Sequence, residues 1–238
     1  MTALTARWVV VDIEGTLTPT DQVHVVLYDY ARPRLGPWID EHPDDPVVVE
    51  AVAQIRSMAD LPASAGTDEI VRVLHGWMAA DQKIAPLKAL QGLIWQRGYA
   101  DGDLVTELFG DVVPALRAWH DKGLDLAVFS SGSVPGQVAA FSRTTDGDIT
   151  SLFSQHFDTV NAGPKREAPS YRAIASALGA PSAEIVFFSD VPAELDAAVA
   201  DGWQTVGLAR PGEPFGDADF GSHLAVKSFA EVSVDLPS

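Results

Sequence analysis

The 238-residue sequence contains no cysteine, which excludes disulfides, thiolate nucleophiles and cysteine-ligated metals. Basic residues are also scarce: 16 Lys and Arg face 33 Asp and Glu, for a formal net charge of −17. An acidic chain is a poor match for a nucleic-acid backbone or an anionic membrane surface. We therefore expect neither nucleic acid nor membrane as a partner.

Long hydrophobic runs and a secretory leader are missing too. No apolar run approaches the ~20 residues of a membrane-spanning helix, and residues 1–7 lack the charged and apolar blocks of a signal peptide. We expect a cytoplasmic protein and take it to be a monomer. Hydrophobic residues nevertheless make up 47% of the chain, which is ample for a packed core.

Apolar runs rich in β-branched residues predict strands that are buried on both faces of a parallel sheet. The runs are Val9–Val11, Leu124–Phe129, Ile185–Phe188 and Trp203–Leu208, with a weaker one at Phe157–Val160. Between them lie helical patterns that each end at a glycine, at Asp111–Lys122, Pro169–Leu178 and Pro192–Asp201. This alternation predicts a right-handed, doubly wound, Rossmann-like α/β core.

The connection after the first strand is too long for this scheme. Roughly 100 residues separate Asp12 from Leu124, whereas a βα loop usually has about 2–6. Helical spacing of apolar residues predicts helices in this gap at Asp21–Arg32, Pro46–Ala59, Thr67–Ala80 and Pro86–Arg97. We therefore expect an inserted all-helical cap domain, 20–110, and a core domain formed by 1–19 and 111–238. The tail after Pro211 is expected to be a loop and a final short strand.

Polar residues follow the ends of the predicted strands, which is where ligands bind in an open parallel sheet. In strand order they are Asp12 and Glu14, then Ser130, Ser131, Gly132 and Ser133, then Lys165, and finally Ser189 and Asp190. We expect these acids, hydroxyls and the one lysine to converge on one edge of the sheet. Such a set suits phosphoryl transfer.

A carboxylate can attack phosphorus and form an aspartyl-phosphate, which divides one difficult step into two. Because two anions repel each other, the attack needs a hard divalent cation, and Mg²⁺ is usually held by a few carboxylates and the phosphate itself. Asp12 and Asp190 are placed to supply those ligands. Glu14 would protonate the leaving oxygen and later act as the base for water.

The serine-rich turn and the lysine are suited to hold the phosphate. Ser130 or Ser131, together with N–H groups of the Ser-Gly-Ser turn at a helix N-terminus, would contact phosphate oxygens. Lys165 would balance the charge that develops there. Each residue alone also has an ordinary structural explanation: Asp12 as a turn residue, Asp190 as a helix cap, Lys165 as a solvated charge. Their joint occurrence in strand order favours the functional interpretation.

The motifs resemble the haloacid dehalogenase superfamily of phosphatases, whose first motif looks like "DIEGT" at residues 12–16. Most members have Asp at the second acidic position, and Glu14 is similar to one family in particular, the enolase-phosphatases (acireductone synthases) of methionine salvage. The resemblance covers nearly the whole chain and includes "VHVVLYDYARPRL", "LKALQGLIWQRGY", "VFSSGSVPGQ", "GPKREAPSYRAIA" and "FFSDVPAELDAA". Leu17 departs from the family pattern, which usually has a second hydroxyl residue there.

The resemblance implies a substrate and a set of roles. The family enolises 2,3-diketo-5-methylthiopentyl-1-phosphate and then dephosphorylates it to the acireductone, with Mg²⁺ in one site. Asp12 is then nucleophile and metal ligand, Glu14 gives its backbone carbonyl to the metal and its side chain as acid and base, and Asp190 is the third protein ligand. The phosphate and substrate contacts fall on Ser130, Ser131, Gly132 and Lys165. Glu194 is then either the residue that holds a metal-bound water or a surface acid of its helix.

The inserted helices are expected to cover the site and to supply the pocket for the methylthio group. Trp95, Leu93 and Tyr28 are candidates to line it, although aromatic residues and Leu at helical spacing are more often core. His24 is a candidate for the enolisation base, against a structural role in its helix.

Two other functions stay open on the sequence. One is a phosphatase of the same core that acts on another small phosphate ester. The other is a non-catalytic protein that binds a phosphometabolite, which fits poorly with four polar groups in catalytic positions. A phosphatase assay with and without EDTA separates the second from the first.

Overall fold

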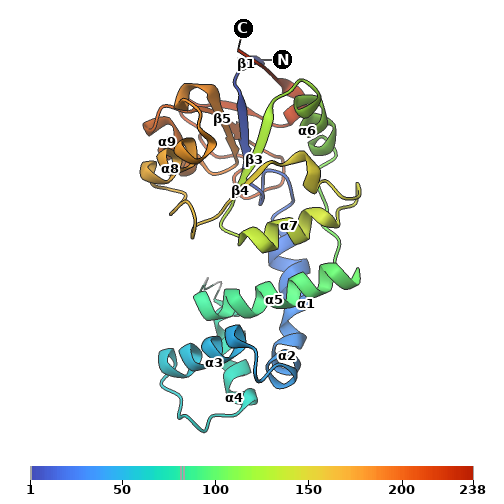
Figure 1. Ribbon diagram of the computed structural model, residues 1–238, viewed down its shortest axis with the longest axis vertical. Coiled ribbons are helices and arrows are strands. Elements are labelled where there is room, and N and C mark those ends of the chain that lie inside the picture. The colour runs from blue at the N-terminus through green and yellow to red at the C-terminus, as the bar shows by residue number, and fades with distance from the viewer. Residues whose placement is uncertain (1, 81, 83, 238) are drawn as a thin grey trace. The chain divides into compact units, whose positions relative to one another are not determined.

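The computed structural model describes residues 2–80, 82 and 84–237 (Figure 1). The chain forms two compact units: Met1–Gln22 together with Val105–Ser238, and the intervening Val23–Leu104. The expected division, with an insert at 20–110, places the limits of the insert a few residues outside those of the second unit. No helix in the described part of the chain is long and apolar enough to cross a membrane.

The first unit is built on a six-stranded parallel sheet in the order β4-β3-β2-β5-β6-β7. Its strands are β2 (Trp8–Val11), β3 (Asp125–Phe129), β4 (Gln155–Phe157), β5 (Ile185–Ser189), β6 (Gln204–Leu208) and β7 (Leu224–Val226). β2 lies in the middle, because Val9 pairs with Leu126 on one side and with Val186 on the other. The predicted doubly wound α/β core is thus confirmed.

Helices cover both faces of this sheet (Figure 1). They are α6 (Val112–Asp121), α7 (Val134–Ser142), α8 (Ala168–Leu178) and α9 (Pro192–Ala200). Side chains alternate along β2, so that Val9 and Val11 pack with Trp119 of α6 on one face, while Val10 packs with Tyr171 of α8 on the other. Burial on both faces explains why the strand is apolar without interruption.

Three details of the sheet differ from the sequence prediction. The strand expected at Phe157–Val160 ends at Phe157, because the Asp158 side chain accepts hydrogen bonds from the N–H groups of Val160 and Asn161 and turns the chain. A separate parallel pair, β1 (Thr2–Thr5) with β8 (Val232–Asp235), was not expected at the N-terminal end, where polar and exposed residues hide the strand signal. The tail holds both β7 and β8 rather than one strand.

The second unit is helical throughout its described elements. They are the π-helical segment η1 (Gln22–Leu27), which begins in the first unit, α1 (Tyr28–Ala31), the 3₁₀ turn η2 (Arg32–Arg34), α2 (Leu35–Glu41), α3 (Pro46–Met58), α4 (Thr67–Ala79) and α5 (Ala85–Asp101). The helix expected to stop at Arg32 instead continues through α2. Pro33 sits in the first positions of the tight turn η2, where its missing N–H costs nothing. Short 3₁₀ turns of the first unit lie at Thr150–Leu152 (η3), Ser182–Glu184 (η4) and Phe229–Glu231 (η5).

Candidate active site

Asp12 stands at the carboxyl end of the central strand. Its backbone N–H continues the ladder by donating to the carbonyl of Phe188 at 2.9 Å, and the residue is only 4% exposed. The chain then turns sharply, with Gly15 at a φ of +71°. A Cβ at Gly15 would lie 2.2 Å from Asp190 Oδ2. Glycine is therefore required here, both for the backbone conformation and for the approach of the Asp190 carboxylate.

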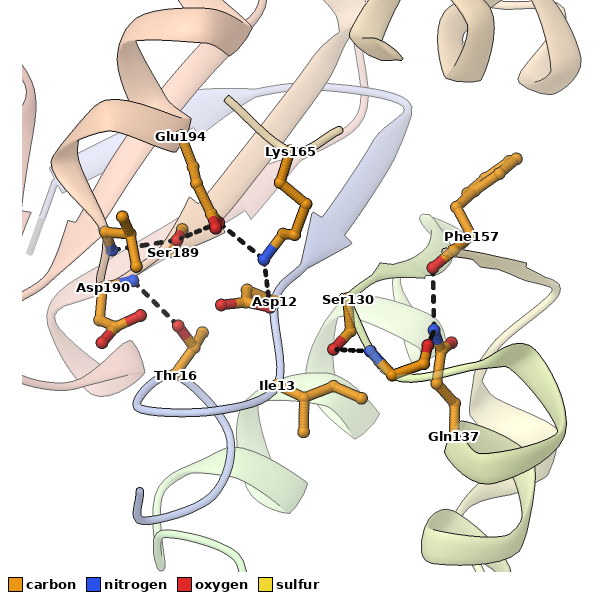
Figure 2. Close-up of polar contacts among 12 residues, drawn as sticks. Asp12, Ile13, Thr16, Ser130, Gln137, Phe157, Lys165, Ser189, Asp190 and Glu194 are labelled. Carbon is orange, nitrogen blue, oxygen red and sulfur yellow. Dashed lines mark hydrogen bonds and ion pairs between the residues drawn. The ribbon is translucent and has the colours of Figure 1, made fainter. Parts of the chain in front are cut away.

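Lys165 enters the site from the loop between β4 and α8. Its Nζ lies 2.5 Å from Asp12 Oδ1 and 2.7 Å from Glu194 Oε2 (Figure 2). The Ser189 hydroxyl also donates to Glu194 Oε2, at 3.0 Å. Tyr171 holds the loop in place, because its hydroxyl donates to the backbone carbonyl of Lys165 at 2.7 Å. Lys165 thus fixes the orientation of the Asp12 carboxylate, and its interpretation as a solvated surface charge is wrong.

The structure places Glu194 in the site as well. Its side chain, on the first turn of α9, is buried, and it forms an ion pair with Lys165 rather than standing in solvent. The alternative of a surface acid is therefore wrong. The proposed contact of Glu194 with a metal-bound water stays a prediction.

Asp190 follows β5, and a hydrogen bond from its backbone N–H holds it in place. Its N–H donates to the Thr16 hydroxyl at 3.0 Å (Figure 2). Among the described residues its buried Oδ1 has no hydrogen-bond partner. A buried carboxylate oxygen without a partner is costly unless a ligand satisfies it. Asp190 is therefore the group in this site that most needs one.

The charges of the site do not balance within the chain. Burial, together with the negative charges of Asp12 and Glu194, raises the pKa of Asp190 to about 8. Burial likewise raises the pKa of Glu194. Burial opposes the charge of Lys165, but the carboxylates of Asp12 and Glu194 outweigh it and hold the pKa of the ammonium above its ordinary value. One cation thus faces three acids, and a further positive charge would stabilise their ionised forms.

These residues fit a magnesium ion. In the described parts of the chain no three His, Cys, Asp or Glu side chains gather into a metal-binding group. The site does offer the carboxylates of Asp12 and Asp190, and the other positions around an ion would fall to backbone and substrate oxygens. Mg²⁺ is usually bound in this way, by one or two carboxylates and substrate phosphates. The partnerless Oδ1 of Asp190 and the excess of negative charge both favour a cation there.

The raised pKa of Asp190 makes the stability of the metal-free protein depend on pH. Because the folded pKa lies above the ordinary value of 3.8, the contribution of this group is fully present below 3.8 and is lost as the pH rises through about 8. We expect Asp190→Asn, measured by urea unfolding in EDTA, to unfold at higher urea than wild type at the alkaline end of this window. The gain should disappear at the acidic end.

The matched control is Asp217→Asn, which changes an exposed acid of the same unit. It should shift unfolding equally at both ends of the window. A parallel pH dependence of Asp190→Asn and wild type would show that Asp190 titrates normally.

The serine-rich turn is rigidly tied to the end of β3. The Ser130 hydroxyl accepts from the N–H of Gly132 at 3.3 Å, and the buried Gln137 side chain donates from Nε2 to the carbonyls of Gly132 and Phe157, both at 2.8 Å (Figure 2). Ser133 caps the N-terminus of α7 by accepting from Gly136 N–H. Ser131 and Gly132 are exposed. The turn thus offers accessible polar groups at a helix N-terminus, the surroundings that an anion prefers.

The predicted site residues are therefore brought together to different degrees. Asp12 and Lys165 are in direct contact, and the charges of both act on the nearby carboxyl group of Asp190. Ser130 lies on the other side of the loop that begins at Asp12 (Figure 2). Glu14 is half-buried in the turn after Asp12, where its backbone bridges to Thr18.

The candidates in the inserted unit take structural positions there. Tyr28, Leu93 and Trp95 belong to the hydrophobic core of that unit, and Trp95 Nε1 donates to the carbonyl of Leu27 at 2.8 Å. The centroids of the His24 and Tyr28 rings lie 5.6 Å apart. These contacts favour the core alternative for the aromatic residues.

Three polar residues that organise the site were not identified from the sequence: Thr16, Gln137 and Arg210. Each is buried and acts through backbone carbonyl or N–H groups. Lone polar residues of this kind carry no spacing signal. Thr16 and Gln137 lie within two of the motifs quoted above, "DIEGT" and "VFSSGSVPGQ". Nothing else in the sequence singles them out.

The chain is similar to several known proteins. Residues 6–201 match the haloacid dehalogenase-like hydrolase family. An enolase-phosphatase E1 from Saccharopolyspora erythraea is 69% identical over 237 residues, which cover 99% of each chain. One from Frankia alni is 53% identical over 230 residues, 97% of this chain and 96% of the relative. The crystal structure of the UTR4 protein from Saccharomyces cerevisiae superposes with a TM-score of 0.77 at 26% identity, covering 95% of this chain and 100% of that one.

Proposed function

Because the chain belongs to the enolase-phosphatase E1 family of haloacid dehalogenase-like hydrolases, we propose that Asp12 is the nucleophile of a magnesium-dependent site that converts 2,3-diketo-5-methylthiopentyl-1-phosphate to the acireductone and phosphate. The observation that carries this proposal is the contact between Asp12 Oδ1 and Lys165 Nζ at the end of the central strand. It orients a buried carboxylate at the point where an open parallel sheet binds its ligands.

The residues divide the phosphate half of the reaction between them. An Asp12 oxygen bonds to phosphorus while the bond from phosphorus to the substrate C1 oxygen breaks, and Glu14 gives that oxygen its proton. Glu14 then takes a proton from water, whose oxygen bonds to phosphorus as the bond to Asp12 breaks and phosphate leaves. Lys165 and the N–H groups of the turn at residues 130–133 balance the charge on the phosphoryl oxygens.

Magnesium would be held by Asp12, Asp190 and the backbone carbonyl of Glu14. When bound, it would neutralise the phosphate charge and polarise the carbonyl whose neighbouring carbon loses a proton in enolisation. The buried, partnerless Oδ1 of Asp190 supports this assignment. Ser130, Ser131 and Gly132 would contact the phosphate.

The test is to supply the diketone phosphate and follow enol absorbance and phosphate release together, with and without EDTA. We expect both signals with Mg²⁺ and neither after chelation. Phosphate release from other small esters, without enol absorbance from the diketone, would favour the general phosphatase instead. Binding without any turnover would favour the non-catalytic protein.

The role of Glu14 makes a separate prediction. If Glu14 serves only the phosphate half, Glu14→Gln should spare proton abstraction from carbon and slow dephosphorylation. Because an enol is a better leaving group than an alcohol, release should be slowed rather than abolished. Rising enol absorbance ahead of free phosphate is the expected signature. An equal fall of both signals would assign Glu14 to enolisation as well.

A further inference from the structure

Arg210 is a buried cation that lies outside the proposed catalytic set. It follows the end of β6, and its side chain is 5% exposed. The guanidinium lies 4.1 Å from the ring centroid of Phe109 and 5.2 Å from that of Phe229. Nη2 has no hydrogen-bond partner in the described structure. A charge in such surroundings is expensive unless its remaining contacts are specific.

Those contacts lead to the loop at residues 12–20, which begins with the proposed nucleophile Asp12 and is called the nucleophile loop below. Arg210 Nε donates to the backbone carbonyl of Thr16 at 2.8 Å, across 194 residues of sequence. The Thr16 hydroxyl in turn accepts from the backbone N–H of Asp190 at 3.0 Å. Thr16 is fully buried. One residue of the loop is therefore held by Arg210 through its carbonyl and holds the Asp190 backbone through its hydroxyl.

The guanidinium is itself fixed at its other end. Nη1 donates to Asp111 Oδ1 at 2.9 Å, and the second oxygen of Asp111 accepts from the Ser228 hydroxyl at 2.8 Å and from the Phe229 N–H at 2.6 Å. Arg210 is thereby anchored to the start of α6 and to the turn η5. Because Nη1 is held in this way, the protein rather than the solvent sets the direction in which Nε donates its hydrogen bond.

The loop after Arg210 also holds the far end of the nucleophile loop. Glu213 Oε2 accepts from the backbone N–H of Thr20 at 2.9 Å and from its hydroxyl at 2.6 Å. The segment 210–213 thus contacts the nucleophile loop at two points, Thr16 and Thr20.

We propose that Arg210 is a positioning residue that, through Thr16, sets the placement of Asp190 relative to Asp12 for binding of the divalent cation. The inference rests on the function proposed above. Residues behind the direct ligands orient them, and their replacement typically lowers metal affinity by about 10- to 100-fold. Lysine at 210 keeps the charge but lacks the planar fork that reaches Thr16 and Asp111 together.

The test is Mn²⁺ binding, measured by electron paramagnetic resonance on folded protein without substrate. We expect Arg210→Lys to weaken Mn²⁺ binding by about 10- to 100-fold. The matched control is Arg172→Lys, because Arg172 has an exposed side chain on α8 that pairs with Asp201 at 3.0 Å. That control should bind Mn²⁺ like wild type.

A double-mutant cycle separates positioning from general stability. Thr16→Val removes the hydroxyl that holds Asp190 and should itself weaken Mn²⁺ binding. If Arg210 acts through Thr16, then Arg210→Lys should add little in the Thr16→Val background. Additive losses would show that Arg210 acts by another route and overturn the proposal.

The remaining outcomes are also decisive. Unchanged Mn²⁺ affinity in folded Arg210→Lys would overturn the positioning role while leaving the proposed function intact. If Arg210→Lys does not fold, the Thr16→Val variant serves as the test instead. Unchanged Mn²⁺ affinity in Thr16→Val would then overturn the positioning role. Wild-type protein that neither binds Mn²⁺ nor releases phosphate would overturn the proposed function, and the positioning role with it.

Discussion

Asp12→Asn is expected to leave the fold intact and to lower phosphate release by several orders of magnitude. An amide is a poor nucleophile and a weaker magnesium ligand than a carboxylate. The fold should survive because the asparagine carbonyl can still accept from Lys165, and one of the buried negative charges is removed. Steady-state phosphate release, with urea unfolding alongside, measures both effects.

The control for Asp12→Asn is again Asp217→Asn, which removes an acid from the same unit at an exposed position. It should retain wild-type turnover. Turnover of Asp12→Asn within tenfold of wild type would remove Asp12 from the nucleophile role and leave it as a metal ligand at most.

Lys165→Ala is expected to lower kcat/KM by roughly a hundredfold or more, the size of effect seen when a stabilising donor is removed from a dehydrated site. The ammonium contacts both Asp12 and Glu194. Without it Asp12 would lose its fixed orientation, and the approach of an anionic phosphate would meet uncompensated acids. Breaking a buried ion pair also destabilises a protein by about 3–5 kcal/mol, so the kinetics must be measured well below the unfolding transition.

Lys122→Ala is the matched control for Lys165→Ala. Lys122 pairs with Asp235 at 2.6 Å at a partly exposed position. It should cost little stability and no activity. A Lys165→Ala variant that unfolds more easily but keeps its kcat/KM would show that the lysine is structural.

The sheet and the main site residues could be predicted from the sequence because their signals are local. An uninterrupted apolar run such as Val9–Val11 marks a strand that is buried on both faces, and a polar residue directly after it marks the ligand edge. Asp12, Asp190 and the turn at 130–133 were all placed by that rule. The same rule misplaced the end of β4, where the Asp158 side chain overrides the β-propensity of Val160 by capping the turn.

The rest of the site could not be predicted because its contacts join distant segments. Arg210 and Thr16 are brought together by the order of the strands, and neither residue type at either position distinguishes a buried contact from a surface one. Glu194 shows the same limit: on its helix it reads equally well as a surface acid, and burial beside Lys165 decides between the two.

The most direct test of the account is to trap the phosphorylated carboxylate. Enzyme turning over the diketone phosphate with Mg²⁺ would be quenched in acid and treated with borohydride, which reduces an acyl phosphate to an alcohol but leaves free carboxylates unchanged. Peptide mass spectrometry should then find homoserine at position 12, dependent on substrate and absent from Asp12→Asn. Reduction at Glu14 or Asp190 instead, or no reduction anywhere during active turnover, would contradict Asp12 as the nucleophile.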